Sequence, residues 1–172
     1  MRRIMKWLSV ALIIQVLVGC DLPQSAEQLR SSPSPAAIFG DPRYRAISYG
    51  GYRGLTRDEA PTLEQVIEDM EILAAMGIKL LRTYNTSQYP LAKLTLEAIS
   101  ALKARDPDFE MYVMLGVWIE ARNAWAEGVW DAENNRWVGD TAPHHTLGNV
   151  ENNTREIETA IRLANSHPDI VK

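Results

Sequence analysis

The 172-residue chain is short of cysteine, of positive charge and of long apolar runs. Cys20 is the only cysteine, so no disulfide can form within the chain. Lysine and arginine number 18 against 22 aspartate and glutamate, which argues against nucleic acid as a partner, because such binding depends on neutralising phosphates. The apolar stretch from Trp7 to Val18 has 12 residues, whereas a membrane-spanning helix needs about 20.

That apolar stretch has instead the pattern of a signal peptide. A basic segment, residues 2–6, precedes it, and Gly19 and Cys20 follow it. A small residue before such a cysteine resembles the bacterial lipobox, in which the cysteine becomes the lipidated N-terminus. We therefore expect residues 1–19 to be a lipoprotein signal peptide and Cys20 to be the lipid attachment site. An ordinary secretory signal with an incidental cysteine is the alternative.

The segment after the signal is expected to connect a membrane anchor to a folded domain. Two or more acyl chains on Cys20 give stable membrane binding. Asp21 resembles the residue that retains some lipoproteins in the inner membrane, so we expect the periplasmic face of that membrane in a bacterial cell envelope. Residues 20–42, rich in Ser, Pro, Ala and Gln, predict a flexible tether. Removing residues 1–19 leaves 15 basic and 22 acidic residues, a net charge of −7.

Residues 43–172 alternate short apolar runs with helical patterns. The apolar runs lie near residues 46, 79 and 112, about 33 residues apart, and this alternation predicts a parallel sheet. Thr62 and Gln65 form a capping box for the first expected helix, which ends at Gly77. The second runs from Leu91 to a stop before Asp106-Pro107, and the third begins at Asn153 with Glu156, with Ile157, Ala160, Ile161 and Ala164 on its apolar face.

The fold class expected is α/β. Residues 168–172 look like the start of a fourth strand, and a (β/α)8 TIM barrel needs about 250 residues. We therefore predict the N-terminal part of such a barrel, with about three βα units and the start of a fourth strand, as an incomplete domain over residues 43–172. The alternative is a small doubly wound sheet. That fold usually carries phosphate-binding glycines after its first strand, and the glycine-rich stretch from Gly50 to Gly54 lacks the dinucleotide fingerprint.

Polar and aromatic residues stand at the ends of the three expected strands, where barrels of this kind place their sites. Arg82 and Tyr84 are two positions apart, so they project from the same face of the second strand. Flat aromatic faces and directed donors together suit the binding of a sugar. The alternatives are a buried salt bridge for Arg82 and packing under a helix for Tyr84. The candidate substrate-binding residues are Tyr49, Arg82, Tyr84, Asn85 and Trp118.

The long segment from Ile119 to Val150 follows the third strand and is rich in tryptophan. Residues 132–135 are expected to form the turn of a hairpin. Trp125, Trp130 and Trp137 suit either stacking platforms for a ligand or a small satellite core. No carboxylate is spaced to complete a metal site with His144-His145, and no metal or other cofactor is expected. Glu120 is interpreted as a loop residue and not as a catalytic acid.

Four segments together resemble the N-terminal half of glycoside hydrolase family 17: "AISYGGYR", "GIKLLRTYN", "YVMLGVWIE" and "AIRLANSHPDIV". The resemblance covers about residues 44–172. It implies a β-1,3-glucanase-like (β/α)8 barrel with a retaining mechanism, by hydrolysis or glucosyl transfer, in which one glutamate is the acid/base and a second is the nucleophile. Both glutamates would follow Lys172, so the resemblance assigns substrate contacts and no catalytic carboxylate to this chain.

These expectations combine into a membrane-anchored, glycoside hydrolase-like protein that acts on β-1,3-glucan in its full-length form. Its expected partners are a β-glucan polysaccharide or oligosaccharide and the membrane, through the lipid anchor. The alternative is a non-catalytic envelope lipoprotein that binds a glycan or a protein partner through the tryptophan-rich loop.

Overall fold

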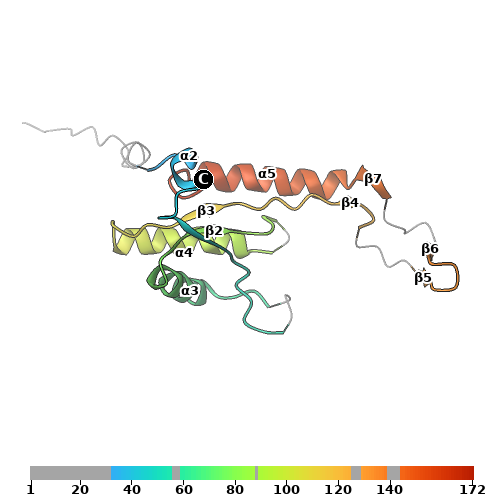
Figure 1. The fold of residues 1–172 in the computed structure, drawn as a ribbon, viewed down its shortest axis with the longest axis horizontal. Coiled ribbons are helices and arrows are strands. Elements are labelled where there is room, and N and C mark those ends of the chain that lie inside the picture. The colour runs from blue at the N-terminus through green and yellow to red at the C-terminus, as the bar shows by residue number, and fades with distance from the viewer. Residues whose placement is uncertain (1–31, 56–58, 88, 125–128, 139–143) are drawn as a thin grey trace, which may run out of the picture.

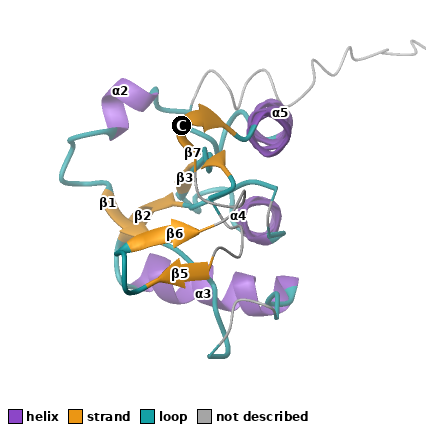
Figure 2. Ribbon diagram, turned by 90° about the vertical axis from the view of Figure 1, so that its right-hand side faces the viewer, coloured by secondary structure: helices purple, strands orange, loops and turns teal. Residues whose placement is uncertain are grey.

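Three parallel strands form the central sheet of this mixed α/β protein. A computed structural model describes residues 32–55, 59–87, 89–124, 129–138 and 144–172. The strands pair in the order β1 (Arg45–Ser48), β2 (Ile78–Arg82) and β3 (Tyr112–Met114), all parallel, which confirms the predicted sheet. The helices α3 (Leu63–Ala75), α4 (Leu91–Arg105) and α5 (Val150–Ser166) lie in an arc along one side of the strands (Figure 2).

An isolated bridge lies where the start of a fourth strand was predicted. Val171 forms a parallel bridge with Val113 of β3. The Val113 amide donates to the Ile170 carbonyl at 3.0 Å, and the Lys172 amide donates to the Val113 carbonyl at 3.0 Å. The edge of β3 is therefore paired, as residues 168–172 predicted.

Two antiparallel pairs are formed by the segment between β3 and α5. β4 (Ala121–Arg122) pairs with β7 (His144–Gly148), and β5 (Val129–Asp131) pairs with β6 (Arg136–Val138). In the second pair, the Asp131↔Arg136 pairing closes the turn 132–135, so the predicted hairpin is confirmed. This hairpin lies beyond the carboxyl-terminal ends of the three parallel strands (Figure 1).

The helix predicted from the capping box is confirmed in detail. The Thr62 side chain accepts a hydrogen bond from the Gln65 amide, and the Gln65 side chain accepts one from the Thr62 amide. Gly77 follows the helix with φ +77°, a left-handed conformation that a residue without a Cβ adopts readily. The local sequence is sufficient to predict the two ends of this helix, because the capping contacts lie within its first turn and Gly77 directly follows its last turn.

The main hydrophobic core lies between the sheet and the helices. Leu81 and Val113 are fully buried from the strands, and Val66, Met70 and Leu96 are fully buried from α3 and α4. α3 and α4 pack closely against each other, and Leu163 of α5 joins the same cluster. This core fixes which face of each strand is covered and which is left for other contacts.

The third helix differs from its prediction in both start and orientation. It begins at Val150, where Asn149 is the N-cap and accepts from the Asn152 amide, so Asn153 and Glu156 lie inside the helix. Ile157 and Ile161, expected on the packed face, are 45% and 56% exposed, whereas Glu156 is 3% exposed. The prediction was wrong because hydrogen bonds to residues distant in the sequence, described below, determine which face turns inward.

Part of the expected tether is folded. Pro35–Ile38 forms the short helix α2, and Ile38 is 1% exposed against Leu80 and Tyr112 on the face of the sheet opposite the main core. Ser32 donates a hydrogen bond to the Asp169 carbonyl at 3.1 Å. A flexible tether is therefore incorrect for residues 32–42, because Ile38 finds an apolar site that its neighbours in sequence do not reveal.

The predicted signal peptide and the lipid attachment site at Cys20 lie outside the described residues. Within the described ranges, none of the helices combines the length and the apolarity that crossing a membrane requires.

Replacing the buried anchor of α2 tests whether residues 35–38 belong to the folded domain. Ile38→Ala should lower the free energy of unfolding by about 2–4 kcal/mol, because it leaves a cavity beside Leu80 and Tyr112. Phe39→Ala is the matched control, since Phe39 is 44% exposed, and it should change stability far less. Urea unfolding measures both, and equal effects of the two variants would contradict the assignment.

Candidate functional site

Arg82 and Tyr84 project from the side of β2 that faces away from α3, α4 and α5. Leu81, before Arg82, and Thr83, between Arg82 and Tyr84, are 0% and 1% exposed. Because side chains alternate along a strand, Arg82 and Tyr84 point to the face opposite to these buried residues. Tyr84 is 43% exposed, and the Arg82 guanidinium carbon lies 5.8 Å from the centroid of its ring. The structure thus brings these two predicted residues together on an accessible face, as the sequence analysis expected.

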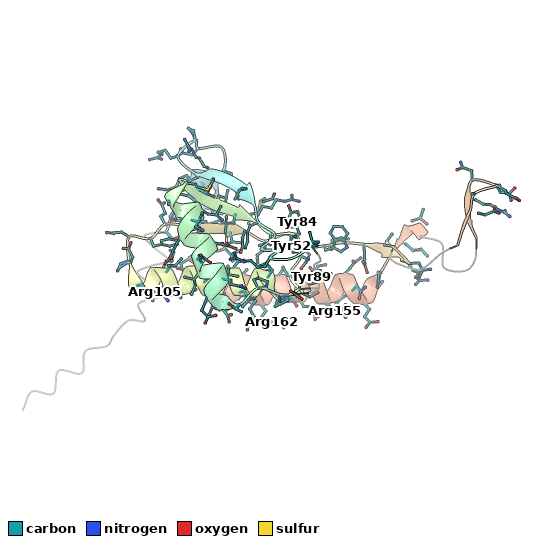
Figure 3. All side chains as sticks on the ribbon, turned by 90° about the horizontal axis from the view of Figure 1, so that it is seen from below. Tyr52, Tyr84, Tyr89, Arg105, Arg155 and Arg162 are labelled. Atoms are coloured by element: carbon teal, nitrogen blue, oxygen red, sulfur yellow. The ribbon has the colours of Figure 1, made fainter. Side chains whose placement is uncertain are left out.

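A hollow opens beside Tyr84 at the carboxyl ends of β1 and β2. Three tyrosines, Tyr52, Tyr84 and Tyr89, line it together with Asn85, and its volume is about 30 Å³. Figure 3 shows these three tyrosines close to one another. The remaining lining residues are Gly50, Glu59, Ala60, Pro61, Thr83, Pro90, Leu91 and Ala92.

Tyr52 and Tyr89 were missed as candidates by the sequence analysis. Each lies in a loop, Tyr52 after β1 and Tyr89 two residues before α4, so neither belongs to a periodic pattern. The signal available was the aromatic residue in each segment that follows a parallel strand, since such segments meet at one edge of the sheet.

The Tyr49 side chain lies on the other face of the sheet. It is 8% exposed in the main core, beside Val66 and Met70, and its hydroxyl donates to Asp69 Oδ2 of α3 at 2.7 Å. Burial and the hydrogen bond to Asp69 both raise the pKa of the Tyr49 phenol above its usual range. The Tyr49 amide donates to the Arg82 carbonyl at 3.0 Å, but the Tyr49 side chain enters the core and not the face that carries the Arg82 and Tyr84 side chains. Its predicted contact with substrate stays a prediction.

Asp69 also holds the segment that follows β1. Arg53 donates to Asp69 Oδ1 at 2.7 Å and to the Gln65 carbonyl at 2.6 Å. One carboxylate on α3 thereby fixes both Tyr49 and Arg53, the residues on either side of the glycine-rich turn. The neighbouring Tyr52 remains 45% exposed beside the hollow.

Trp118, at the end of the third expected strand, is 41% exposed. Its backbone amide donates to Glu156 Oε2 at 3.3 Å. Just before it, Gly116 donates from its amide to Thr83 Oγ1 at 3.0 Å, and a Cβ on Gly116 would lie 2.1 Å from the Thr83 carbonyl oxygen. A glycine is therefore required for the segment that leads to Trp118 to approach β2 so closely.

Glu156 of α5 is the acceptor for two segments of this edge. Its carboxylate receives the Thr86 amide at 2.8 Å, the Thr86 hydroxyl at 2.9 Å and the Ser87 amide at 2.7 Å, as well as the Ser87 hydroxyl. Burial acts to raise the pKa of Glu156, but these donors, with the Ser87 hydroxyl foremost, outweigh it and lower the pKa to about 2. The sequence pattern placed Glu156 at the start of the third helix and gave no signal for this role.

Glu120 is a buried residue of the same region. It is 8% exposed, and its carboxylate accepts hydrogen bonds from the side chains of Asn149 and Asn152, while its backbone amide donates to Asn153 Oδ1 at 2.9 Å. Glu120 thus joins the segment after β3 to the first turn of α5, which agrees with its interpretation as a loop residue.

The side chains of Trp125, Trp130, Trp137, His144 and His145 lie outside the described part of the structure. Among the residues that the structure does describe, no group of three or more His, Cys, Asp or Glu side chains is arranged to hold a metal ion.

Comparison with known proteins finds one kind of similarity, to a solved structure. The chain matches no protein-family model and no curated protein. It is similar to a solved structure described as the crystal structure of an endo-laminarinase from Formosa Hel1_33_131, with 43% sequence identity and a TM-score of 0.70. The match covers 81% of this chain and 32% of that chain, so this chain spans about a third of the length of its relative. It therefore resembles part of a glycosidase in both sequence and fold.

The titration of Glu156 predicts a loss of stability in acid. A folded-state pKa of about 2 against an ordinary value of 4.5 means that the ionised form stabilises the fold above pH 4.5, and this contribution is lost as the pH falls toward 2. The shift in pKa corresponds to a contribution of about 3 kcal/mol to the free energy of unfolding. Urea unfolding between pH 2 and 6 should show wild type more stable than Glu156→Gln at pH 6, with the difference shrinking toward pH 2.

Glu158→Gln is the matched control for this titration, because Glu158 is an exposed glutamate two residues further along α5. A difference between wild type and Glu156→Gln that stays constant from pH 6 to pH 2 would contradict the ionised, hydrogen-bonded carboxylate.

Proposed function

We propose that this chain is the substrate-binding N-terminal part of a retaining β-1,3-glucanase or glucanosyltransferase of glycoside hydrolase family 17. The observation that carries the proposal is the 43% identity to an endo-laminarinase over 81% of this chain. Laminarin is a β-1,3-glucan, and the exposed Arg82, Tyr84 and Trp118 have the chemistry that binding a glucan requires.

The parallel sheet is proposed to be the first part of a (β/α)8 barrel. Each of the three strands is followed along the chain by a helix, and all three helices lie on one side of the sheet, as in the outer ring of such a barrel. In that arrangement Arg82 and Tyr84 face the inside, and the hollow lined by the three tyrosines opens at the carboxyl-terminal face, where barrel enzymes place their active sites.

The residues described here are proposed to bind and not to cleave. A general acid for glycoside hydrolysis holds its proton near neutral pH and therefore has a raised pKa. The pKa of Glu156 is instead lowered to about 2, and its two oxygens are occupied by donors from residues 86, 87 and 118. Glu120 is held by two asparagine side chains. We assign the acid/base and the nucleophile to later strands of the barrel, as the family resemblance implies.

Membrane attachment through lipidated Cys20 is part of the proposal. The basic segment 2–6, the apolar stretch from Trp7 to Val18 and the small residue before Cys20 support it. The anchor would hold the glucan-binding domain at the periplasmic face of the inner membrane. Mass spectrometry of the mature N-terminus tests this directly, with a diacylglyceryl cysteine at position 20 as the expected result.

Substitution at the accessible face tests glucan binding. Calorimetric titration of the full chain in detergent with laminarihexaose should show binding, and Arg82→Ala and Tyr84→Ala should each weaken it by about tenfold. The losses follow from a missing charged donor and a missing aromatic face, each worth about 1–2 kcal/mol. Cellohexaose, the β-1,4-linked isomer, should bind more weakly than laminarihexaose.

Arg105→Ala is the matched control, because Arg105 is an exposed arginine at the last turn of α4, away from Tyr84 (Figure 3). It should leave the affinity unchanged. Absence of laminarihexaose binding by the wild-type chain would overturn the proposal for these residues.

A further inference from the structure

Glu156 connects two segments that are far apart in the sequence. The first, Thr86-Ser87, follows β2, and the second contains Trp118 and follows β3. Four donors from Thr86 and Ser87 and the backbone amide of Trp118 all reach the same carboxylate. Oε1 takes both Ser87 groups, whereas Oε2 takes both Thr86 groups and the Trp118 amide. The two segments are therefore cross-linked through one side chain.

Each of these segments carries an exposed aromatic residue next to the bonded groups. Tyr84 and Asn85 directly precede Thr86, and Tyr84 is 43% exposed. Trp118 is 41% exposed, although its own backbone amide is one of the donors. The carboxylate thus sets the position of one aromatic surface relative to the other, while both rings remain accessible to a ligand.

The contacts are too specific for a residue that only closes the core. Glu156 is 3% exposed, and α5 turns it inward while Ile157, the next residue, stays 45% exposed. A buried carboxylate is tolerated only where donors replace its water, and here all the named donors come from strand-end segments. The Thr86 hydroxyl also donates to the Glu156 backbone carbonyl at 2.8 Å, which holds the helix itself against the same segment.

We propose that Glu156 is a positioning residue for the glucan site. It aligns Tyr84 and Asn85 on one side with Trp118 on the other, so that a single β-1,3-glucan chain contacts both aromatic surfaces at once. The inference rests on the proposed function and deepens it. It assigns to Glu156 no contact with substrate and no proton transfer.

A positioning role makes the effect of Glu156 depend on the length of the ligand. A hexasaccharide long enough to contact both surfaces loses affinity when the surfaces are misaligned. A disaccharide that contacts only one surface is nearly unaffected. General destabilisation of the fold would instead lower the affinity for both ligands by the same factor.

The test uses Glu156→Gln, in which an amide NH₂ replaces one oxygen and confronts donors that need an acceptor. In the full chain, Glu156→Gln should bind laminarihexaose about tenfold more weakly, in line with hydrogen bonds to a charged group, and laminaribiose less than about twofold more weakly. Hydrogen exchange without ligand should be faster at the amides of Thr86, Ser87 and Trp118. Glu158→Gln, an exposed neutralisation on the same helix, should match wild type in all three measurements.

Ser87→Ala provides a second, milder variant that removes one donor and keeps the carboxylate. It should weaken laminarihexaose binding in the same direction, by about threefold, without a comparable effect on laminaribiose. This variant decides the question if Glu156→Gln fails to give a cooperative thermal transition.

The outcomes separate this inference from the proposed function. A wild-type chain that binds neither oligosaccharide overturns the proposed function. Suppose that wild type binds laminarihexaose. If Ser87→Ala and a folded Glu156→Gln then bind it with the same affinity as wild type, the positioning role is overturned. A loss of the same size for both ligand lengths also overturns it, because that result indicates general destabilisation.

Discussion

The burial of one ionised carboxylate determines how the carboxyl edge of the sheet is organised. Glu156 takes up the amides of Thr86, Ser87 and Trp118, groups that the short strands leave without partners in the sheet. Buried backbone donors must be paired, and a buried carboxylate must be surrounded by donors, so the two requirements satisfy each other. The orientation of α5 follows from this arrangement more than from its own apolar pattern.

The same solution occurs on a second helix. Asp69 of α3 accepts from Tyr49 and Arg53 and so fixes the segment after β1, much as Glu156 of α5 fixes the segments after β2 and β3. In both cases the carboxylate stands on a helix and its donors stand on a strand end. The exposed aromatic residues near these contacts thereby stand on segments that are hydrogen-bonded to helices, and such support is what precise ligand binding needs.

Features that depend on neighbours in sequence were predictable, and features that depend on distant partners were not. The capping box at Thr62, the hairpin turn 132–135 and the parallel order of the strands all follow from local pattern and connection length. The folded segment around Ile38 and the inward face of α5 did not, because a proline- and serine-rich composition and an isoleucine pattern describe average tendencies. Of the candidate site residues, strand alternation placed Arg82 and Tyr84 correctly on one face, while Tyr49 proved to lie in the core.

The amino-acid sequence by itself determined the alternation of strands and helices, the side of β2 to which Arg82 and Tyr84 belong, and the resemblance to a glucan-acting family. Only the tertiary structure decided that Tyr52 and Tyr89 join Tyr84 around one hollow, and that Glu156 connects segments 69 and 38 residues away in the chain. The physical reason is that alternation and capping are set within a few residues. Hydrogen bonds to a buried carboxylate instead depend on where the chain returns, which no local pattern records.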